Sequence, residues 1–287
     1  MLNLRKYLID IVVDELRRAY QRTYSDMHPS FANIIAWSGR LALENIANSD
    51  ALYHNMEHTI QVALVGQAIL EGKHLCEGGV TPRDWMHVTI ALLCHDIGYV
   101  RGVCRRDTEG IYATGVGEEV VAIASNGTDA ALTRYHVDRS KQFVYERFGG
   151  TLLEDGAVDP AVLAAYIEMT RFPVPEDEAR ADTKGYGGLV RAADYIGQLG
   201  DPDYMRKAAA LYYEFEEIGA NAKHGYQSPG DLRATFASFY WGVVSPYIQG
   251  ALHFLRQTQE GQEWIARLSA LVFTAEHKHR METISHS

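Results

Sequence analysis

The stretch TPRDWMHVTIALLCHDIGY, residues 81–99, decides how this chain of 287 residues folds. It opens with Thr81, Pro82 and Asp84, which favour a helix start: a hydroxyl N-cap, a proline at the first helical position and an acid in the first turn. Gly98 stands where such a helix would end. Because apolar residues recur at helical spacing between these signals, we predict an amphipathic α-helix over this stretch.

The inner end of this predicted helix carries polar side chains. Its apolar stripe consists of Trp85, Val88 and Leu92. The next position on the stripe is His95, and Asp96 follows directly. Burying a carboxylate beside an imidazole is costly unless the charge is compensated, and a bound cation is the usual compensation.

Helical periodicity extends over most of the remaining chain. The sequence shows no convincing β-alternation and no internal repeat, and we predict that the glycine-rich segment 100–135 is an irregular insertion or lid. Further helices are expected over 4–20, after Ser38, from about Asn55 to Leu70, from Asp159-Pro160, from Asp201-Pro202, and from an N-cap at Asp231 to a break at Pro246. We therefore expect one all-α domain over residues 1–287, with a motif core at about 50–215 and additional helices at both ends.

Composition narrows the classes of function. The chain is 47% hydrophobic with a formal net charge of -10, which argues against general nucleic-acid binding and against an anionic membrane surface. The three cysteines, Cys76, Cys94 and Cys104, indicate neither a disulfide framework nor a zinc ribbon. Since the chain also lacks a signal peptide and a long apolar run, we expect a cytoplasmic protein. The sequence leaves a homo-oligomer open.

A second polar site precedes the first. In Tyr53-His54-Asn55-Met56-Glu57-His58, the two histidines are four residues apart and share a helix face. Val62 and Val65 continue the apolar stripe from His58, so we expect His58 to face the core. Taken alone, a histidine on an apolar face is more often a hydrogen-bonded core residue than a metal ligand.

A third polar site is Asp194, within the apolar helical run of residues 188–197. An ion pair with Arg191, one turn away, would be its ordinary explanation. Three buried polar sites on three apolar helices are explained more simply by one shared cation. Two imidazoles and two carboxylates suit Zn, Fe, Mn, Co or Ni, while Mg is matched less well, and an octahedral ion would keep positions for water and substrate.

The order Tyr-His-Asn-x-x-His, then His-Asp, then a distant Asp resembles the HD superfamily of metal-dependent phosphohydrolases. Within that superfamily the opening motif is most similar to the helical cyclic-nucleotide phosphodiesterases. The resemblance implies an HD-domain, phosphodiesterase-like helical bundle. It also implies that His58, His95, Asp96 and Asp194 hold one divalent metal ion, and that Asp96 bridges to a second.

The same resemblance implies that His54 is the general acid that protonates the leaving oxygen. Its position one turn before His58 agrees with this role, since it places the imidazole beside the metal. Asn55 is a candidate partner of the metal ligands.

The motif departs from the phosphodiesterase pattern at Tyr99, where those enzymes have another histidine. The outer ligands of a second metal are therefore uncertain, and Tyr99 itself becomes a candidate residue of that site. His136 resembles a later histidine that some HD proteins use for a second metal. Thr170 resembles a threonine near the phosphodiesterase site, although a helix-end cap is its simpler interpretation.

Four arginines are candidates for phosphate binding: Arg101, Arg105, Arg106 and Arg171. Guanidinium groups bind phosphate through paired hydrogen bonds. A solvated loop face explains them equally well, because surface charges rarely need a purpose.

These observations favour a metal-dependent phosphohydrolase that cleaves a small-molecule phosphate ester, such as a nucleotide, with water activated by one or two metal ions. Three alternatives remain open at this point: a cyclic-nucleotide phosphodiesterase, a metal-bearing nucleotide sensor or binding module with little turnover, and a di-iron HD oxygenase. The purine-binding glutamine of the phosphodiesterases has no clear counterpart in this sequence, with Gln249 and Gln257 as candidates by position alone.

Overall fold

The stretch that opens at Thr81 forms helix α4 (Pro82–Cys94), and its start is the predicted one. The Thr81 hydroxyl accepts a hydrogen bond from the Asp84 amide at 3.1 Å, and the Asp84 carboxylate accepts one from the Thr81 amide at 3.1 Å. The helix ends before Gly98, contrary to the prediction. A short 3₁₀ turn, η1 (Ile97–Tyr99), follows, so His95 and Asp96 lie in the bend between the two elements.

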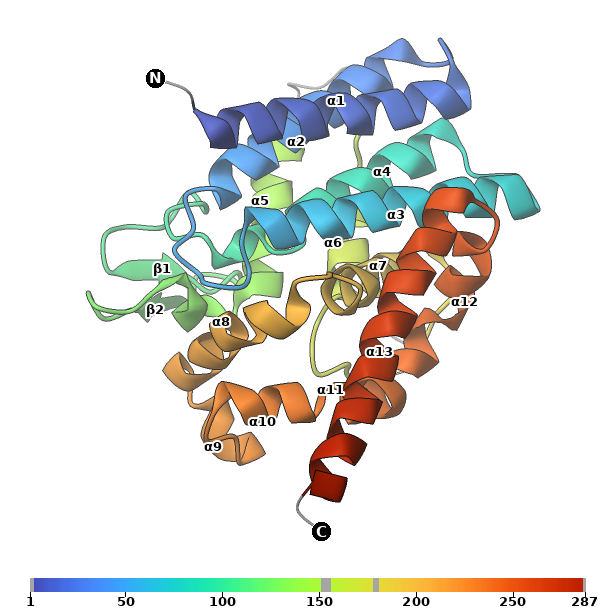
Figure 1. Ribbon diagram of the computed structural model, residues 1–287. Coiled ribbons are helices and arrows are strands. Elements are labelled where there is room, and N and C mark those ends of the chain that lie inside the picture. The colour runs from blue at the N-terminus through green and yellow to red at the C-terminus, as the bar shows by residue number, and fades with distance from the viewer. Residues whose placement is uncertain (1–2, 151–155, 178–180, 286–287) are drawn as a thin grey trace.

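The computed structural model describes residues 3–150, 156–177 and 181–285, and it is all-α apart from one small hairpin (Figure 1). The N-terminal elements besides α4 and η1 are α1 (Leu4–Tyr24), α2 (Pro29–Ile46), α3 (Met56–Glu77), β1 (Ile111–Ala113), β2 (Val120–Ala122), η2 (Asp129–Leu132) and α5 (His136–Phe148). The remaining elements are α6 (Pro160–Glu168), α7 (Tyr186–Leu199), α8 (Tyr204–Glu217), α9 (Ala220–His224), α10 (Pro229–Ala234), α11 (Phe236–Phe239), the π-helical turn η5 (Tyr240–Val244), α12 (Ser245–Leu255) and α13 (Gln259–Ser285).

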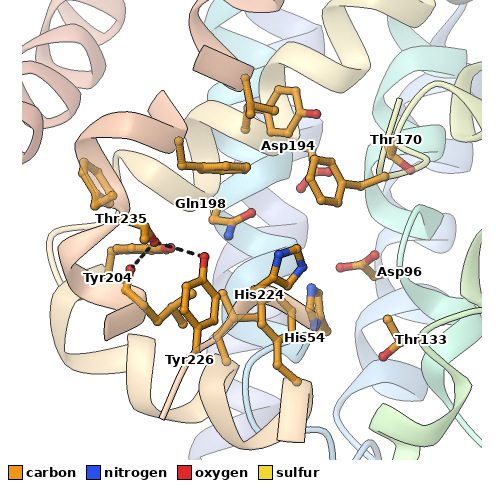
Figure 2. A pocket seen from close by; sticks show the side chains of 18 of the residues that line it. His54, Asp96, Thr133, Thr170, Asp194, Gln198, Tyr204, His224, Tyr226 and Thr235 are labelled. Atoms are coloured by element: carbon orange, nitrogen blue, oxygen red, sulfur yellow. Dashed lines mark hydrogen bonds between the residues drawn. The ribbon is translucent and has the colours of Figure 1, made fainter. Parts of the chain in front are cut away.

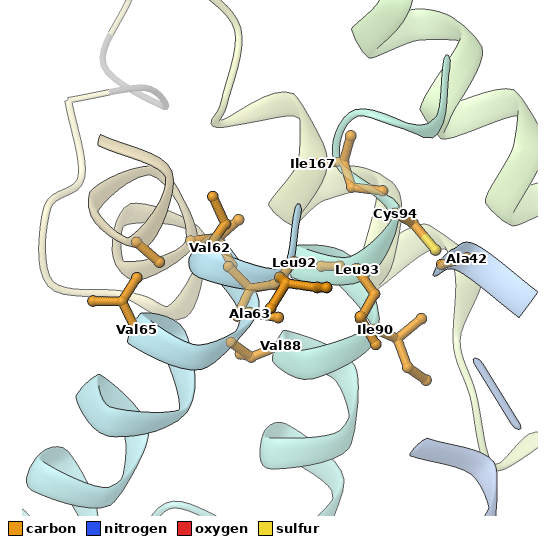
Figure 3. Close-up of a cluster of buried hydrophobic side chains, with 14 of the residues drawn as sticks. Ala42, Val62, Ala63, Val65, Val88, Ile90, Leu92, Leu93, Cys94 and Ile167 are labelled. Carbon is orange, nitrogen blue, oxygen red and sulfur yellow. The ribbon is translucent and has the colours of Figure 1, made fainter. Parts of the chain in front are cut away.

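Helices α3, α4 and α7 form the centre of the molecule, and the four candidate metal ligands come from these three helices and their ends. Apolar side chains of α3 and α4 interlock there, including Val62, Val88 and Leu92 (Figure 3). Gly197 of α7 packs directly on α3, since a Cβ atom at this position would lie 2.9 Å from Val62 Cγ2. A bulkier residue would push α7, which carries Asp194, away from α3.

The other helices cover this centre. Helices α1 and α2 lie along one side, α12 and α13 along another, and α8 to α11 form a third group (Figure 1). One continuous set of buried apolar side chains extends from Ile9 to Val272 and so joins these groups. Among the described residues, no helix is both long enough and apolar enough to cross a membrane.

The segment 100–135 is more regular than predicted. Strands β1 and β2 pair antiparallel within it, with Tyr112 opposite Val121. Its base is fixed by Arg139 of α5, a fully buried cation whose guanidinium binds both oxygens of Asp107 at 3.0 and 2.9 Å. The Asp107 carboxylate also accepts three backbone N–H groups, those of Gly102, Cys104 and Ala113. The segment is therefore anchored to α5 by a buried ion pair.

Other predicted helices also differ from the structure. Helix α2 begins at Pro29, so Ser38 lies buried within it. Helix α8 begins at Tyr204, because Asp201 instead forms a turn by accepting the Asp203 amide. The helix predicted from Asp231 to Pro246 is divided into α10, α11 and η5.

The start of that C-terminal region also differs in its cap. Ser228 is the N-cap of α10, and Asp231 is the acid three residues later that accepts the Ser228 amide. The break expected at Pro246 is found: the π-helical turn η5 ends there and α12 begins, with the proline in its first turn.

Candidate metal centre

The first candidate ligand, His58, is held by the start of α3. Asn55 is the N-cap, and its side-chain oxygen accepts hydrogen bonds from the amides of Glu57 at 2.9 Å and His58 at 3.4 Å. Its amide group donates to the Leu52 carbonyl at 3.0 Å. Asn55 therefore acts by fixing the helix start rather than by contacting an imidazole, and His58 is buried in the first turn.

The second pair, His95 and Asp96, is held by the bend after α4. Ser140 of α5 fixes this bend, because its hydroxyl donates to the His95 carbonyl at 2.7 Å and accepts the Gly98 amide at 2.9 Å. Gly98 is needed there, since a Cβ atom at this position would lie 2.0 Å from the His136 carbonyl oxygen. The close contact between this bend and α5 sets the positions of both ligands.

Asp194 comes from the middle of α7. The ion pair with Arg191 that would have explained it without a metal is not formed: the Arg191 guanidinium points to the Met169 carbonyl, at 2.8 Å, and lies over the Tyr247 ring. The Asp194 carboxylate instead faces the two imidazoles.

The four predicted ligands converge. His58 Nε2 lies 3.4 Å from Asp96 Oδ2 and 3.2 Å from Asp194 Oδ1. His95 Nε2 lies 3.2 Å from Asp96 Oδ2 and 3.6 Å from Asp194 Oδ1. Two atoms bound to one ion at about 2.1 Å are about 3.0 to 3.4 Å apart at octahedral or tetrahedral angles. The spacing therefore matches a ligand set, and His58, His95 and Asp194 form a group that could hold a metal ion.

The hydrogen bonding of this cluster is incomplete. His95 Nδ1 lies 2.7 Å from the Leu92 carbonyl, which can only accept, so this nitrogen carries the proton and Nε2 of the neutral ring presents a lone pair. His95 Nε2 and Asp96 Oδ2 are both buried, and no described residue supplies either with a hydrogen-bond partner. A lone pair facing carboxylate oxygens is repulsive unless a cation lies between them, so the donor set fits a divalent metal ion.

The protonation behaviour of the cluster agrees with a cation site. Burial disfavours charged imidazoles, but the adjacent carboxylates outweigh burial and raise the pKa of His58 and, more strongly, that of His95. Burial likewise opposes charged carboxylates, but the imidazoles hold the pKa values of Asp96 and Asp194 below the ordinary value. The four side chains thus favour bound positive charge, and a metal ion would displace protons from the imidazoles.

The second oxygen of Asp96 faces another histidine. Asp96 Oδ1 lies 3.7 Å from His136 Nε2, and His136 Nδ1 lies 2.6 Å from the Thr133 carbonyl, so Nε2 presents its lone pair as in His95. Burial lowers the pKa of His136 and so favours this neutral form. The structure therefore brings His136 to the position where Asp96 could bridge to a second ion.

Tyr99 separates His136 from His54. Its ring is buried and stacks on His54 at a centroid distance of 4.5 Å and on His136 at 4.4 Å. Tyr99 therefore acts as a spacer between two imidazoles. Thr170 lines the cavity described below. Its hydroxyl donates to the Ile167 carbonyl at 2.9 Å, in agreement with the simpler interpretation of a helix-end cap.

Glu214 is a site residue that the sequence analysis missed. Its buried carboxylate lies 2.6 Å from His54 Nδ1 and also accepts the Tyr53 amide at 2.6 Å. Burial alone would lower the pKa of His54, but the Glu214 charge and hydrogen bond raise it to about 9. The sequence did contain an indication of this role, because Glu214 is an acidic residue on the buried face of α8, next to Leu211.

The four arginines predicted to bind phosphate lie off the cavity wall, which corrects that assignment. Three of them are paired with acids: Arg101 with Asp50 and Asp129, Arg106 with Glu118, and Arg171 with Glu168 and Asp138. The Arg105 guanidinium donates to the backbone carbonyl of Glu146. Proximity to the His-Asp motif in sequence does not direct these guanidinium groups to the site, because nearer acceptors bind them.

A cavity of about 480 Å³ opens onto Asp96, Asp194 and His54. In Figure 2, Asp96 and Thr170 face it from one side, and Tyr204, Tyr226 and Thr235 from the other. Segment 100–135 contributes Thr133 to the lining.

Gln198 is a second residue that the sequence analysis missed. It lies one turn after Asp194 on α7 and projects into the cavity (Figure 2). Its position could have been inferred from its spacing of four residues from Asp194, which places both side chains on one face of the helix. Gln249, a candidate by position, instead binds the Ser245 carbonyl within α12.

Comparison with known proteins yields one family. The model of the Npun_R2479-like family matches residues 2–278, which is almost the whole chain. No curated protein matches. The chain therefore belongs to the Npun_R2479-like family.

Proposed function

We propose that this protein is an HD-type, metal-dependent phosphohydrolase that cleaves a small-molecule phosphate ester. The observation that carries the proposal is a pair of buried atoms, His95 Nε2 and Asp96 Oδ2, that have no hydrogen-bond partner in the described part of the chain. Asp96 lines a cavity that can hold an organic molecule. A site that needs a cation and adjoins a substrate-sized cavity supports metal-assisted hydrolysis.

His58, His95, Asp96 and Asp194 would hold the ion. A divalent ion bound there would supply a Lewis acid for the phosphoryl oxygens and acidify a water. His95 is prepared for this role because the Leu92 carbonyl fixes its tautomer. Asp194 is the most accessible of the four carboxylate and imidazole side chains, with 18% of its side chain exposed, so it borders the space that substrate would occupy.

His54 supplies the proton. Glu214 binds its Nδ1 at 2.6 Å, so Nε2 is the atom left to face the cavity. The Glu214 carboxylate keeps this imidazole protonated at neutral pH, with the pKa raised to about 9 despite burial. A protonated imidazole beside the metal can donate to the leaving oxygen as the phosphorus–oxygen bond breaks. Stacking on Tyr99 fixes the ring plane for this transfer.

The test combines metal analysis with a panel of phosphate esters. The purified protein is stripped of metal, reloaded in turn with Mn²⁺, Mg²⁺, Co²⁺, Ni²⁺, Zn²⁺ and Fe²⁺, and assayed for phosphate or alcohol release from linear and cyclic esters. We expect metal-dependent hydrolysis that His54→Gln reduces while metal content is kept. Bound metal without turnover of any ester would contradict the proposal and favour a sensor. Product formation that requires oxygen and iron would favour an oxygenase instead.

A further inference from the structure

We infer that the cavity selects an ester whose organic part is planar and uncharged and carries a single phosphate, and that it discriminates against esters with further phosphates. This inference rests on the hydrolytic function proposed above. It is drawn from the chemistry of the cavity walls rather than from the metal centre.

Aromatic rings form the walls opposite the metal ligands. Phe239 and Phe172 meet edge to face at a centroid distance of 5.9 Å, and Phe236 packs on Tyr204 at 5.1 Å. Rings of this kind favour a flat apolar group, which they contact through both faces and edges. A cavity of about 480 Å³ has room for such a group next to the metal centre.

The polar groups between the metal ligands and these rings are neutral. Gln198 contributes a carboxamide, and Tyr226 and Thr235 share a hydrogen bond between their hydroxyls at 3.2 Å. His224 also lines the cavity, but its ring stacks against Tyr226 at a centroid distance of 5.5 Å. Within the described part of the chain, the lining contains no lysine and no arginine.

The His54 imidazolium lies at the metal end of the cavity, and the neighbouring arginines are paired with acids. Arg171 binds Glu168 and Asp138, and Arg101 binds Asp129, in each case at 2.6 or 2.7 Å. The cavity itself carries two carboxylates at its metal end. One phosphate there is balanced by the bound ion. Further phosphates between that position and the rings would lose water without gaining a cation.

Ser238 offers a way to reverse the selection. It lines the cavity near its opening, is exposed to solvent, and donates its hydroxyl to the Thr235 carbonyl at 2.9 Å. A lysine at this position would add the missing cation without touching the metal ligands or His54. Glutamine has a similar length and no charge, so Ser238→Gln is the matched control.

The experiment compares kcat/KM for 1-naphthyl phosphate and for adenosine mono-, di- and triphosphate. For the unmodified protein we expect a fall of about tenfold or more with each added phosphate, since unbalanced charge is repelled from an acidic site. Ser238→Lys should raise the ratio of triphosphate to naphthyl phosphate hydrolysis several-fold, and Ser238→Gln should leave that ratio near the original value. Equal or better hydrolysis of the triphosphate by the unmodified protein would overturn the inference.

A binding measurement separates this inference from the proposed function. Calorimetry with the Mn²⁺-loaded His54→Gln variant gives affinities for the same four compounds without relying on turnover. Tighter binding of the monophosphates than of the triphosphate supports the selection even if no ester is hydrolysed. Triphosphate binding as tight as monophosphate binding would refute it, whatever the activity.

Discussion

Two buried clusters of charge lie on either side of Gly98, and they differ in how their atoms are satisfied. In the first, Arg139 donates to both oxygens of Asp107 and to the carbonyls of Gly98, Val100 and Ala113. In the second, the metal centre, His95 Nε2 and Asp96 Oδ2 have no hydrogen-bond partner among the described residues. Burial of charge is common to both clusters, so burial alone does not indicate a site. Single unpartnered atoms such as Trp85 Nε1 also occur elsewhere, so what distinguishes the candidate metal centre is that two such atoms face each other within one cluster of ligand-type side chains.

The two clusters should also respond differently to mutation. Removing a member of the Arg139 cluster leaves an unpaired buried charge, so it should act on folding. Removing a member of the candidate metal centre takes away a proposed ligand, so it should act on metal content and activity. The following changes test this separation.

The largest effect is expected for Asp96→Ala. This change removes the carboxylate that faces both imidazoles, so we expect loss of the bound metal and a fall in kcat of at least about a thousandfold, as for other residues that act as a unit. Metal content by mass spectrometry and ester hydrolysis measure it, with circular dichroism as the check on folding. An Asp96→Ala protein that keeps both metal and activity would refute the metal centre.

Arg139→Met should act on stability instead. It leaves the Asp107 carboxylate buried with backbone amides as partners but no counter-charge, and breaking a buried pair in this way costs about 3 to 5 kcal/mol of unfolding free energy. Urea denaturation measures the loss. The double change Arg139→Met with Asp107→Asn removes both charges, so it should recover part of the stability. A single variant as stable as the original would contradict a structural role.

Metal removal should destabilise the protein in a pH-dependent way. An ion at one hundred times its Kd contributes about 2.7 kcal/mol, which chelation removes. In the metal-free protein, the raised pKa values of His58 and His95 stabilise the folded state. This stabilisation is fully present below about pH 6.5, the pKa of histidine in the unfolded chain. That contribution is lost as pH rises through the folded values. The lowered pKa values of Asp96 and Asp194 contribute above about pH 4 and are lost as pH falls below it.

Thermal melts with and without chelator, across pH 5 to 10, would measure this effect. The gap between the two melting temperatures should widen as pH rises, because the protons that substitute for the metal are lost. A gap that is constant over this range would show that the imidazoles do not exchange protons for metal.

Glu214→Gln should give the smallest change, about tenfold in kcat/KM, as is usual for partners of catalytic groups. Without this carboxylate, only the charges of Asp96 and Asp194 oppose the effect of burial, so the pKa of His54 falls from about 9. Since the general acid must be protonated, the alkaline limb of the pH profile should move to lower pH. Glu217→Gln, an exposed acid on the same helix, is the control. An unmoved alkaline limb would remove His54 from the proton-donor role.

The four candidate ligands could be predicted because each is marked by local sequence. His58, His95 and Asp194 lie on or next to apolar stripes whose spacing can be read along the chain, and Asp96 adjoins one of them. Glu214 could not be assigned to His54 in the same way, because 160 residues separate them and the contact depends on how α8 packs. Which of the many aromatic residues line the cavity also depends on how the helices pack, so the sequence could not show it.

The errors have physical causes as well. The predicted C-terminal helix is several shorter elements in the structure. The π-helical turn before Pro246 and the separate N-cap at Ser228 interrupt it, and neither changes the regular spacing of apolar residues from which one helix was predicted. The arginines near the motif were assigned to phosphate from their sequence position, whereas their directions depend on acidic partners such as Asp129 and Glu168. Helix faces can be inferred from a pattern, but the direction of a long charged side chain cannot.

The contact at Gly98 has a mechanical consequence. Ser140 accepts a hydrogen bond from the Gly98 amide, and Arg139 donates one to the Gly98 carbonyl. Because Gly98 has no side chain, α5 packs directly against the bend. The bend and α5 should therefore move as one rigid body, and Asp96 and His136 with them. Asp194 belongs to a different body, helix α7. The distance from Asp194 to the other three side chains is therefore set separately, by the close approach of Gly197 to α3.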